Sequence, residues 1–196
     1  MPQDISRHNS VTKSLISLGA NVISPAGAPA RTVRAAFEAL EDDEIVVVSR
    51  SRLFATPCMP AGAGPDYVNA AALITSSLPA AGLLDRLHRI EARFERRRDT
   101  RWGARTLDID LLDHGGQIAP DLKTWWTWHD LPLEMQMVQA PDRPILPHPR
   151  IQDRAFALLP LADVAPGWRH PVLGLSVAQM RARLTAGALS GIAPIG

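Results

Sequence analysis

The order of periodic segments along the 196-residue chain limits the fold more than any other feature. Two segments with apolar residues three and four positions apart predict helices at 32–42 and 79–94. Four alternating or apolar, partly β-branched runs predict strands at 14–19, 45–54, 66–77 and 106–112. The chain therefore follows the order strand, helix, strand, strand, helix, strand.

This order predicts an α+β fold, a ferredoxin-like antiparallel sheet with a βαββαβ core and packed helices. We expect a C-terminal extension with a turn at PHPR (147–150) and helices near 153–163 and 176–185. Residues 1–12 are polar and predict a disordered tail. The remainder, 13–196, has the length of a single domain.

Bulk properties exclude several classes of protein. No apolar run reaches the ~20 residues of a membrane-spanning helix, and the N-terminal MPQDISRHNSVTK lacks the apolar centre of a signal peptide. A net charge of +1 gives no overall attraction to nucleic acid or membranes. Cys58 is the single cysteine, so no internal disulfide can form and we expect a cytoplasmic, reducing location.

The predicted strand TLDIDLL carries two carboxylates in an apolar run. Alternation places Leu107, Ile109 and Leu111 on one face, and Asp108 and Asp110 on the other, about 7 Å apart. Because neighbouring carboxylates repel each other, a divalent cation such as Mg²⁺ would stabilise the pair. A solvated strand face, or salt bridges to nearby arginines, is the alternative interpretation.

A basic loop precedes this strand, and Gly103 allows it to bend. Its cations suit a polyphosphate, because the planar guanidinium binds phosphate through two hydrogen bonds. A simple solvated basic loop is the alternative. No GxxxxGK[ST] motif is present, so any ATP is not bound by a P-loop. The loop arginines are Arg96, Arg97, Arg98, Arg101 and Arg105.

One predicted strand carries groups suited to a flat heterocycle. Tyr67 and Asn69 are two positions apart and share a face. An aromatic ring can stack on such a ligand, and an amide can both donate and accept hydrogen bonds at its edge. Core packing is the alternative for Tyr67. His148, between two prolines, is by itself typical of a turn residue.

Four blocks in order resemble the 6-hydroxymethyl-7,8-dihydropterin pyrophosphokinase family of the folate pathway, from about Ser14 to Ala165. They are SLGAN (17–21), FATPCMP with DYVNAA (54–60 and 66–71), RRRDTRWGARTLDIDLL (96–112), and ILPHPRIQDRAFALLPLADVAP (145–166). The resemblance implies transfer of a pyrophosphoryl group from ATP to the pterin hydroxymethyl oxygen, with release of AMP. It also implies small-molecule substrates, and we expect a monomer.

The resemblance further implies roles for individual residues. Asp108 and Asp110 would hold two Mg²⁺ ions, and Asp110 is the candidate base. Arg96 and Arg98 would be catalytic loop arginines, with Trp102 packed at the closed site. The implied ATP-binding residues are Glu91, Arg98, Arg105, Leu111, Arg143, His148 and Arg154. The implied pterin-binding residues are Thr56, Pro57, Met59, Tyr67, Asn69, Trp102 and Phe156.

The sequence departs from the family pattern at several positions, of which two matter most here. Glu95 stands where the family usually has glycine before its first loop arginine, so the register is open and Arg97 is an alternative. Residues 121–142 are interpreted as an insertion. Its tryptophans, Trp125, Trp126 and Trp128, either pack it onto the domain or form a surface for a partner or a dimer.

Two other functions compete with this interpretation. A metal-dependent nucleotidyltransferase or phosphodiesterase could use the same D-x-D pair, but would give Tyr67, Asn69 and Phe156 no role. An RNA-binding ferredoxin-like domain would present aromatic and basic residues on its central strands. Asp108 and Asp110 would instead repel a phosphate backbone.

Overall fold

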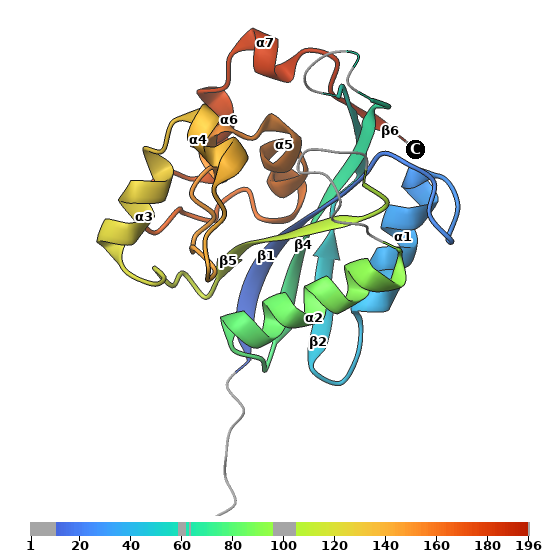
Figure 1. The fold of residues 1–196 in the computed structure, drawn as a ribbon, viewed down its shortest axis with the longest axis horizontal. Helices are drawn as coiled ribbons and strands as arrows, with labels where there is room; N and C mark the ends of the chain where they lie inside the picture. Colours follow the sequence, from blue (N-terminus) through green and yellow to red (C-terminus); the bar gives the residue numbers. More distant parts are fainter. Residues whose placement is uncertain (1–10, 59–61, 63, 96–104, 196) are drawn as a thin grey trace, which may run out of the picture.

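The computed structural model describes residues 11–58, 62, 64–95 and 105–195. Its strands form one antiparallel sheet in the order β5-β1-β4-β3-β6, and β2 also pairs with β4 (Figure 1). The strands are β1 (Thr12–Ala20), β2 (Ile45–Arg50), β3 (Leu53–Thr56), β4 (Tyr67–Ser76), β5 (Asp108–His114) and β6 (Ala193–Ile195). The predicted mixed α/β fold with an antiparallel sheet is confirmed.

Helices surround the sheet, and none in the described ranges is long and apolar enough to cross a membrane. They are α1 (Pro29–Leu40), α2 (Ala80–Arg93), α3 (Leu122–His129), α4 (Leu133–Val138), α5 (Ala155–Val164), α6 (Val177–Ala182) and α7 (Ala186–Leu189), with a 3₁₀ turn at Ile151–Asp153. The predicted helix near 176–185 corresponds to α6, which ends at Ala182. The sequence did not predict α3, α4, α7 or β6.

The predicted strand 45–54 is interrupted rather than continuous. Ser51 N donates to Ala71 O (2.9 Å), and Ala71 N donates to the Ser51 hydroxyl (2.9 Å). The Ser51 side chain thus replaces a backbone acceptor, and the chain steps from β2 to β3 while both strands remain on β4. A hydroxyl competing for a backbone amide in this way gives no signal in hydrophobic periodicity.

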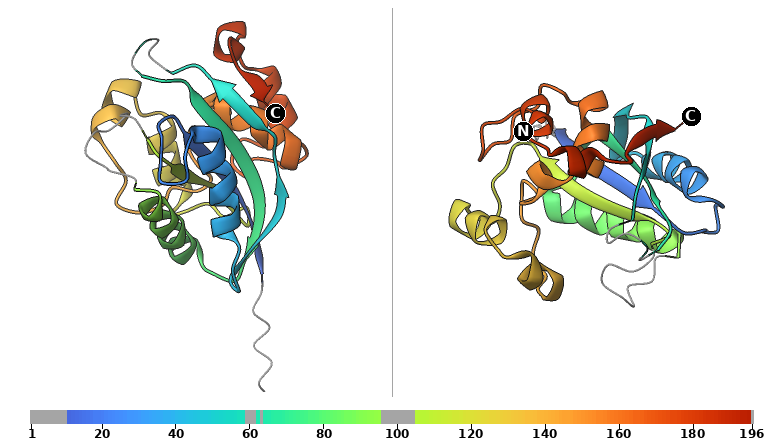
Figure 2. Two further views of the ribbon diagram at one scale, coloured as in Figure 1. Left: turned by 90° about the vertical axis from the view of Figure 1, so that its right-hand side faces the viewer. Right: turned by 90° about the horizontal axis from the view of Figure 1, so that it is seen from above.

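The first face of the sheet is covered by α1 and α2 (Figure 2). Phe37 and Leu40 of α1, and Leu83 and Leu87 of α2, are buried against Ile16 and other strand residues. Burying each such side chain contributes about 1.5–3 kcal/mol. The predicted inward set Leu107, Ile109 and Leu111 joins this core, which leaves Asp108 and Asp110 to the opposite face.

The second face is only partly covered. Leu15 of β1 and Leu112 of β5 pack against Leu158 and Leu161 of α5 and Met180 of α6. Figure 2 shows α5 and the C-terminal helices on this side of the sheet. Asn69 and Asp110 belong to this second face by alternation with their buried neighbours. One end of the face is therefore apolar and the other carries polar side chains.

Helix α3, in the segment that the sequence predicts to be an insertion, packs onto the rest of the fold through one tryptophan. Trp125 is 0% exposed, and its Nε1 donates to Pro147 O (2.7 Å). Its ring stacks on His129 with centroids 4.9 Å apart. Trp126 remains 39% exposed. Trp125 therefore fixes α3 to the segment that leads into His148.

His170 is buried in the same aromatic cluster. It is 0% exposed, and its ring centroid lies 5.3 Å from that of Trp125 and 5.7 Å from that of Trp168. Its Nδ1 accepts hydrogen bonds from the amides of Val172 and Leu173. Burial, with a smaller effect from His129, lowers the pKa of His170 to about 4. The ring is therefore neutral in the folded protein near pH 7.

We expect His170 to make stability fall with acidification. Between about pH 6.5 and about pH 4 the unfolded chain binds a proton at this position that the folded chain does not. The free energy of unfolding should therefore decrease across this window, by up to about 3 kcal/mol. Asn at this position offers an acceptor for the two amides but does not titrate, so His170→Asn should flatten the profile.

Urea unfolding at several pH values would measure the difference, and the other histidines cancel because both proteins contain them. Equal slopes of stability against pH in wild type and His170→Asn would contradict the prediction.

Candidate active site

The register of β1 aligns an amide and two carboxylates on the second face. Gly19 pairs with Asn69 of β4 on one side and with Asp108 of β5 on the other. Ser17, one row further along the same face, pairs with Asp110. Paired Cα atoms are about 4.5–5.5 Å apart, so Asn69 and Asp108 lie about 10 Å apart across β1. This separation suits two halves of one substrate-binding site.

Gly19 makes room in the middle of this row. A Cβ at this position would lie 2.7 Å from Asn69 Oδ1 and 3.9 Å from Tyr67 Cδ1. The first distance is shorter than real Cβ contacts allow, so Asn69 can lie over β1 only because Gly19 has no side chain. The sequence predicted a strand ending at Gly19, but it did not show this role.

The Asn69 amide is held in one orientation. Its Nδ2 donates to Thr56 Oγ1 (3.0 Å), and both residues are buried. Thr56 is the last residue of β3, and Pro57 follows it, half-buried. The structure therefore brings together three of the predicted pterin residues, Thr56, Pro57 and Asn69, at one corner of the sheet.

Arginines from two different segments compensate the two carboxylates. Arg105 forms an ion pair with Asp108, and Arg154 Nη1 lies 3.1 Å from Asp110 Oδ2. Burial acts to lower the pKa of Arg105, but the charges of Asp108 and Asp110 raise it above its ordinary value. The salt-bridge interpretation left open by the sequence is thus observed. These ion pairs are compatible with a metal site, because each carboxylate has about four lone-pair positions and one arginine does not occupy all of them.

Asn21 connects the segments around this pair. Its Oδ1 accepts from Arg105 N (2.7 Å), and its own N donates to Arg105 O (3.0 Å). Its Nδ2 donates to Pro65 O (3.1 Å). This buried asparagine (4% exposed) was not predicted as a site residue. The available signal was its position directly after an apolar strand.

Two predicted aromatic residues border the polar end of the face. Tyr67 is half-buried, and burial raises the pKa of its phenol while the charge of Arg105 opposes this shift. Phe156 lies in the first turn of α5, with the guanidinium of Arg154 5.6 Å from its ring centroid. Because Arg154 contacts Asp110, Phe156 belongs to the surroundings of the carboxylate pair.

His148 is held as a neutral hydrogen-bond donor. Its backbone N donates to Leu112 O (2.8 Å), and its Nδ1 accepts from Arg150 N (3.1 Å). A neutral ring then carries its proton on Nε2. Burial, followed by the charge of Arg154, lowers the pKa of His148 well below its ordinary value, and Asp108 opposes this. His148 is therefore a turn residue that also lies close to the site.

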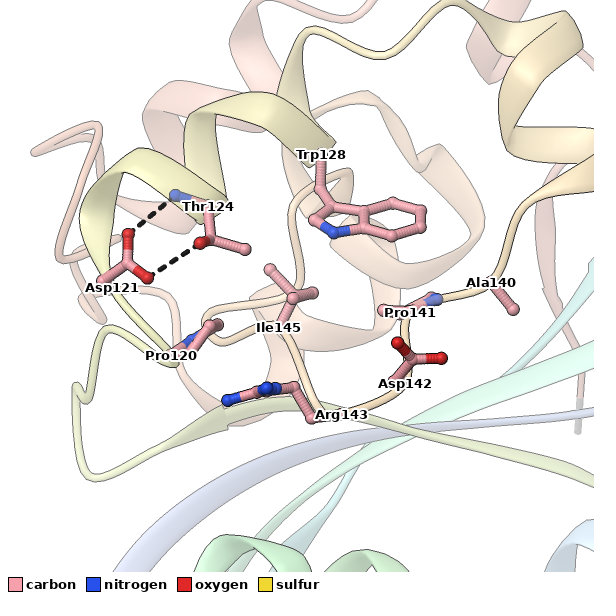
Figure 3. A pocket seen from close by; sticks show the side chains of 9 residues that line it. All are labelled: Pro120, Asp121, Thr124, Trp128, Ala140, Pro141, Asp142, Arg143 and Ile145. Atoms are coloured by element: carbon pink, nitrogen blue, oxygen red, sulfur yellow. Dashed lines mark hydrogen bonds between the residues drawn. The ribbon is translucent and has the colours of Figure 1, made fainter.

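Other predicted residues lie outside this cluster. The Leu111 side chain faces the first-face core, so only its backbone can face the site. Glu91 is 1% exposed, and its Oε1 accepts from Ile109 N (2.7 Å). Arg143 lines a separate hollow of about 300 Å³ beside α3, with Trp128 as another wall (Figure 3). Arg96, Arg98, Trp102 and Met59 lie outside the described residues.

Comparison with known families identifies the family of this chain. Residues 15–166 match the sequence profile of the 7,8-dihydro-6-hydroxymethylpterin-pyrophosphokinase (HPPK) family. The chain belongs to the HPPK family. All the predicted site residues fall inside the matched range, whereas α6, α7 and β6 follow it.

Individual HPPK relatives cover most of the chain. It is 36% identical over 161 residues to the 2-amino-4-hydroxy-6-hydroxymethyldihydropteridine pyrophosphokinase of Pseudomonas aeruginosa, covering 82% of this chain and 85% of that protein. Identity to the protein of the same name from Synechocystis sp. is 35% over 145 residues, which span 74% of this chain and only 61% of the relative.

Solved structures show the same fold. A Plasmodium falciparum HPPK-DHPS triple mutant superposes with a TM-score of 0.62 at 15% identity. The alignment covers 91% of this chain and 45% of the Plasmodium chain. At this identity the likeness concerns the fold alone.

We expect Glu91 to support the edge of β5. Glu91→Ala would leave the Ile109 amide without this acceptor and should lower the free energy of unfolding by about 1–3 kcal/mol. Glu91→Gln keeps an acceptor and should recover most of the loss. Thermal or denaturant unfolding of the two variants tests this, and a fully stable Glu91→Ala would show that the contact contributes nothing.

Proposed function

We propose that the chain transfers a pyrophosphoryl group from ATP to the hydroxymethyl oxygen of 6-hydroxymethyl-7,8-dihydropterin and releases AMP, for folate synthesis. Membership of the HPPK family supports the reaction. The observation that carries it is the row across β1, with the Thr56–Asn69 amide on one side and the carboxylates on the other. The strand order, with α1 and α2 on one face, supports the ferredoxin-like interpretation.

The donor set of the carboxylate pair suits magnesium. Within the described ranges, no group of three or more His, Cys, Asp or Glu residues is arranged so that it could hold a metal ion, so Asp108 and Asp110 would act as a pair. Mg²⁺ binds one or two carboxylates and completes its shell with water and substrate phosphates. We propose that the pair holds two Mg²⁺ ions, which when bound neutralise charge on the triphosphate of ATP.

Arginines and His148 provide the nucleotide side of the proposal. Arg105 and Arg154 already lie beside the carboxylates and can bind phosphate oxygens through their remaining N–H groups. Neutral His148 offers Nε2–H as a further donor. Glu91, Arg143 and the backbone of Leu111 would contact ATP. Arg96 and Arg98 would bind the pyrophosphoryl group during its transfer.

The other side of the row would bind the pterin. The Asn69 amide is fixed by Thr56, so its Oδ1 offers an oriented acceptor to a ring N–H. Tyr67 and Phe156 would contribute aromatic surface, and Pro57 would line the ring edge. Met59 and Trp102 complete the proposed pterin set.

The reaction is an in-line displacement at the β-phosphorus of ATP. The pterin oxygen forms a bond to this phosphorus and loses its proton, with Asp110 as the candidate acceptor. The bond from the β-phosphorus to the oxygen bridging it to the α-phosphate breaks, and AMP leaves. Catalysis then depends on positioning and charge neutralisation. We further propose that the protein acts on these small molecules as a cytoplasmic monomer. The free thiol of Cys58 fits a reducing compartment.

Product identity tests the function. The purified full chain is mixed with ATP, Mg²⁺ and the pterin, and the nucleotides are resolved. AMP formed only in the presence of pterin supports the proposal. ADP would indicate a simple kinase, and pterin-independent release of pyrophosphate or AMP would favour the competing nucleotide chemistries. No pterin-dependent turnover would overturn the proposal.

Removing either carboxylate charge should abolish most activity. We expect Asp108→Asn and Asp110→Asn each to lower kcat by on the order of a hundred-fold or more. The exposed Asp85→Asn on α2 is a matched control that should retain activity. Binding of Mn²⁺ with a non-hydrolysable ATP analogue, followed by electron paramagnetic resonance, should weaken in the first two variants. Unchanged Mn²⁺ binding there would exclude the pair as metal ligands.

The Thr56 hydroxyl should matter for pterin alone. Thr56→Val keeps the shape but removes the partner of the Asn69 amide. The KM for pterin should rise roughly ten-fold, while the KM for ATP stays constant. Thr56→Ser restores the hydroxyl and should recover affinity. Equal increases in both KM values would point to general damage instead.

A further inference from the structure

The end of the chain returns to the sheet beside the proposed pterin corner. Strand β6 pairs antiparallel with β3, with Ala193 opposite Ala55 and Ile195 opposite Leu53. The residue after Ala55 is Thr56, which holds the Asn69 amide. The segment that reaches this corner, Gly191–Ile195, follows the range matched to the HPPK family. Figure 1 shows β6 along the β3 edge of the sheet.

Gly191 lies directly against Pro57. A Cβ at Gly191 would lie 2.6 Å from Pro57 Cγ and 3.4 Å from Pro57 Cδ. Gly191 also has a φ of +74°, a left-handed conformation that favours glycine. It follows the short helix α7, so the chain can turn over the proline ring and enter β6. No residue with a side chain fits this position without displacing Pro57.

The other end of the segment is anchored in the core. Ile195 is partly buried and packs against the first-face core, which includes Leu53. Pairing with β6 gives β3 a neighbour on each side, because β4 lies on its other edge. An edge strand without such a neighbour presents unpaired backbone groups. Residues 191–195 therefore pair with the outer edge of β3 as far as Ala55, and Gly191 packs directly against Pro57.

We propose that residues 191–195 form a C-terminal clasp that positions Thr56 and Pro57 for binding of the pterin. The clasp rests on the proposed function, because its target is the pterin half of that site. It makes Gly191 a positioning residue that acts through Pro57, with no contact to ATP. Loosening the clasp should weaken binding of pterin selectively.

Two variants of the full chain loosen the clasp at different points. Gly191→Ala forces a methyl group onto Pro57, and Ile195→Ser weakens the core anchor. Gly174→Ala is the matched control, because Gly174 has a similar φ of +68° but no heavy atom within 4 Å of the position that a Cβ would take. It introduces the same backbone strain without touching the corner.

Cys58 reports on the corner without any substrate. It is the only cysteine, follows Pro57, and its amide donates to Asp66 Oδ1 (3.0 Å). We expect the rate at which a thiol reagent labels Cys58 to rise several-fold in Gly191→Ala and Ile195→Ser. The rate in Gly174→Ala should equal that of wild type.

Kinetics provide the second readout. The KM for pterin should rise roughly ten-fold in the two clasp variants, because small misplacements of binding groups are costly, with kcat and the KM for ATP nearly unchanged. Wild-type labelling rates in both clasp variants, or equal increases in both KM values with a lower Tm, would overturn the clasp. Faster labelling in the clasp variants, combined with no pterin-dependent AMP formation by the wild-type protein, would refute the proposed function and the clasp's role in pterin binding.

Discussion

Because Gly19 pairs with Asn69 on one side and Asp108 on the other, the central strand β1 sets the spacing between the two halves of the proposed site. A glycine is required there, since a Cβ would meet the Asn69 oxygen. Two further residues orient the side chains in and around this row. Asn21, just beyond the same strand, holds Arg105, while Thr56 orients Asn69 from β3.

Charge balance is the second constraint. Asp108 and Asp110 lie on the second face of the sheet, and Arg105 and Arg154 reach them from separate segments. The four side chains of these pairs are only 17–33% exposed, so the attraction within each pair is partly offset by the cost of removing its charges from water. The same residues thus balance charge in the fold and belong to the proposed substrate-binding site.

Periodicity predicted much of this arrangement. The alternation in TLDIDLL placed Asp108 and Asp110 opposite Leu107, Ile109 and Leu111, because side chains on a strand alternate irrespective of tertiary context. The role of Gly19 was hidden, because it depends on which residue of another strand lies opposite.

Contacts between distant segments were also hidden. Ser51, which divides the predicted strand in two, and Trp125, which anchors α3, act through partners that local patterns do not contain. The same applies to β6, three residues long, whose pairing depends on the exposed edge of β3. For Glu91, the family resemblance implied a nucleotide contact, and the structure adds a hydrogen bond to β5 that only the packing of α2 reveals.

The pairing of β1 with β5 also has a consequence for how the protein reaches its native state. The Ser14 hydroxyl bonds to His114, 100 residues further along the chain, and the row through Gly19 closes over a similar separation. Loops of this size carry a large closure entropy, and topologies rich in such distant pairs fold slowly. No short stretch of chain contains both halves of the row. During synthesis, Gly19 of β1 is made first and can pair with Asp108 only after β5, about 90 residues later, has been made.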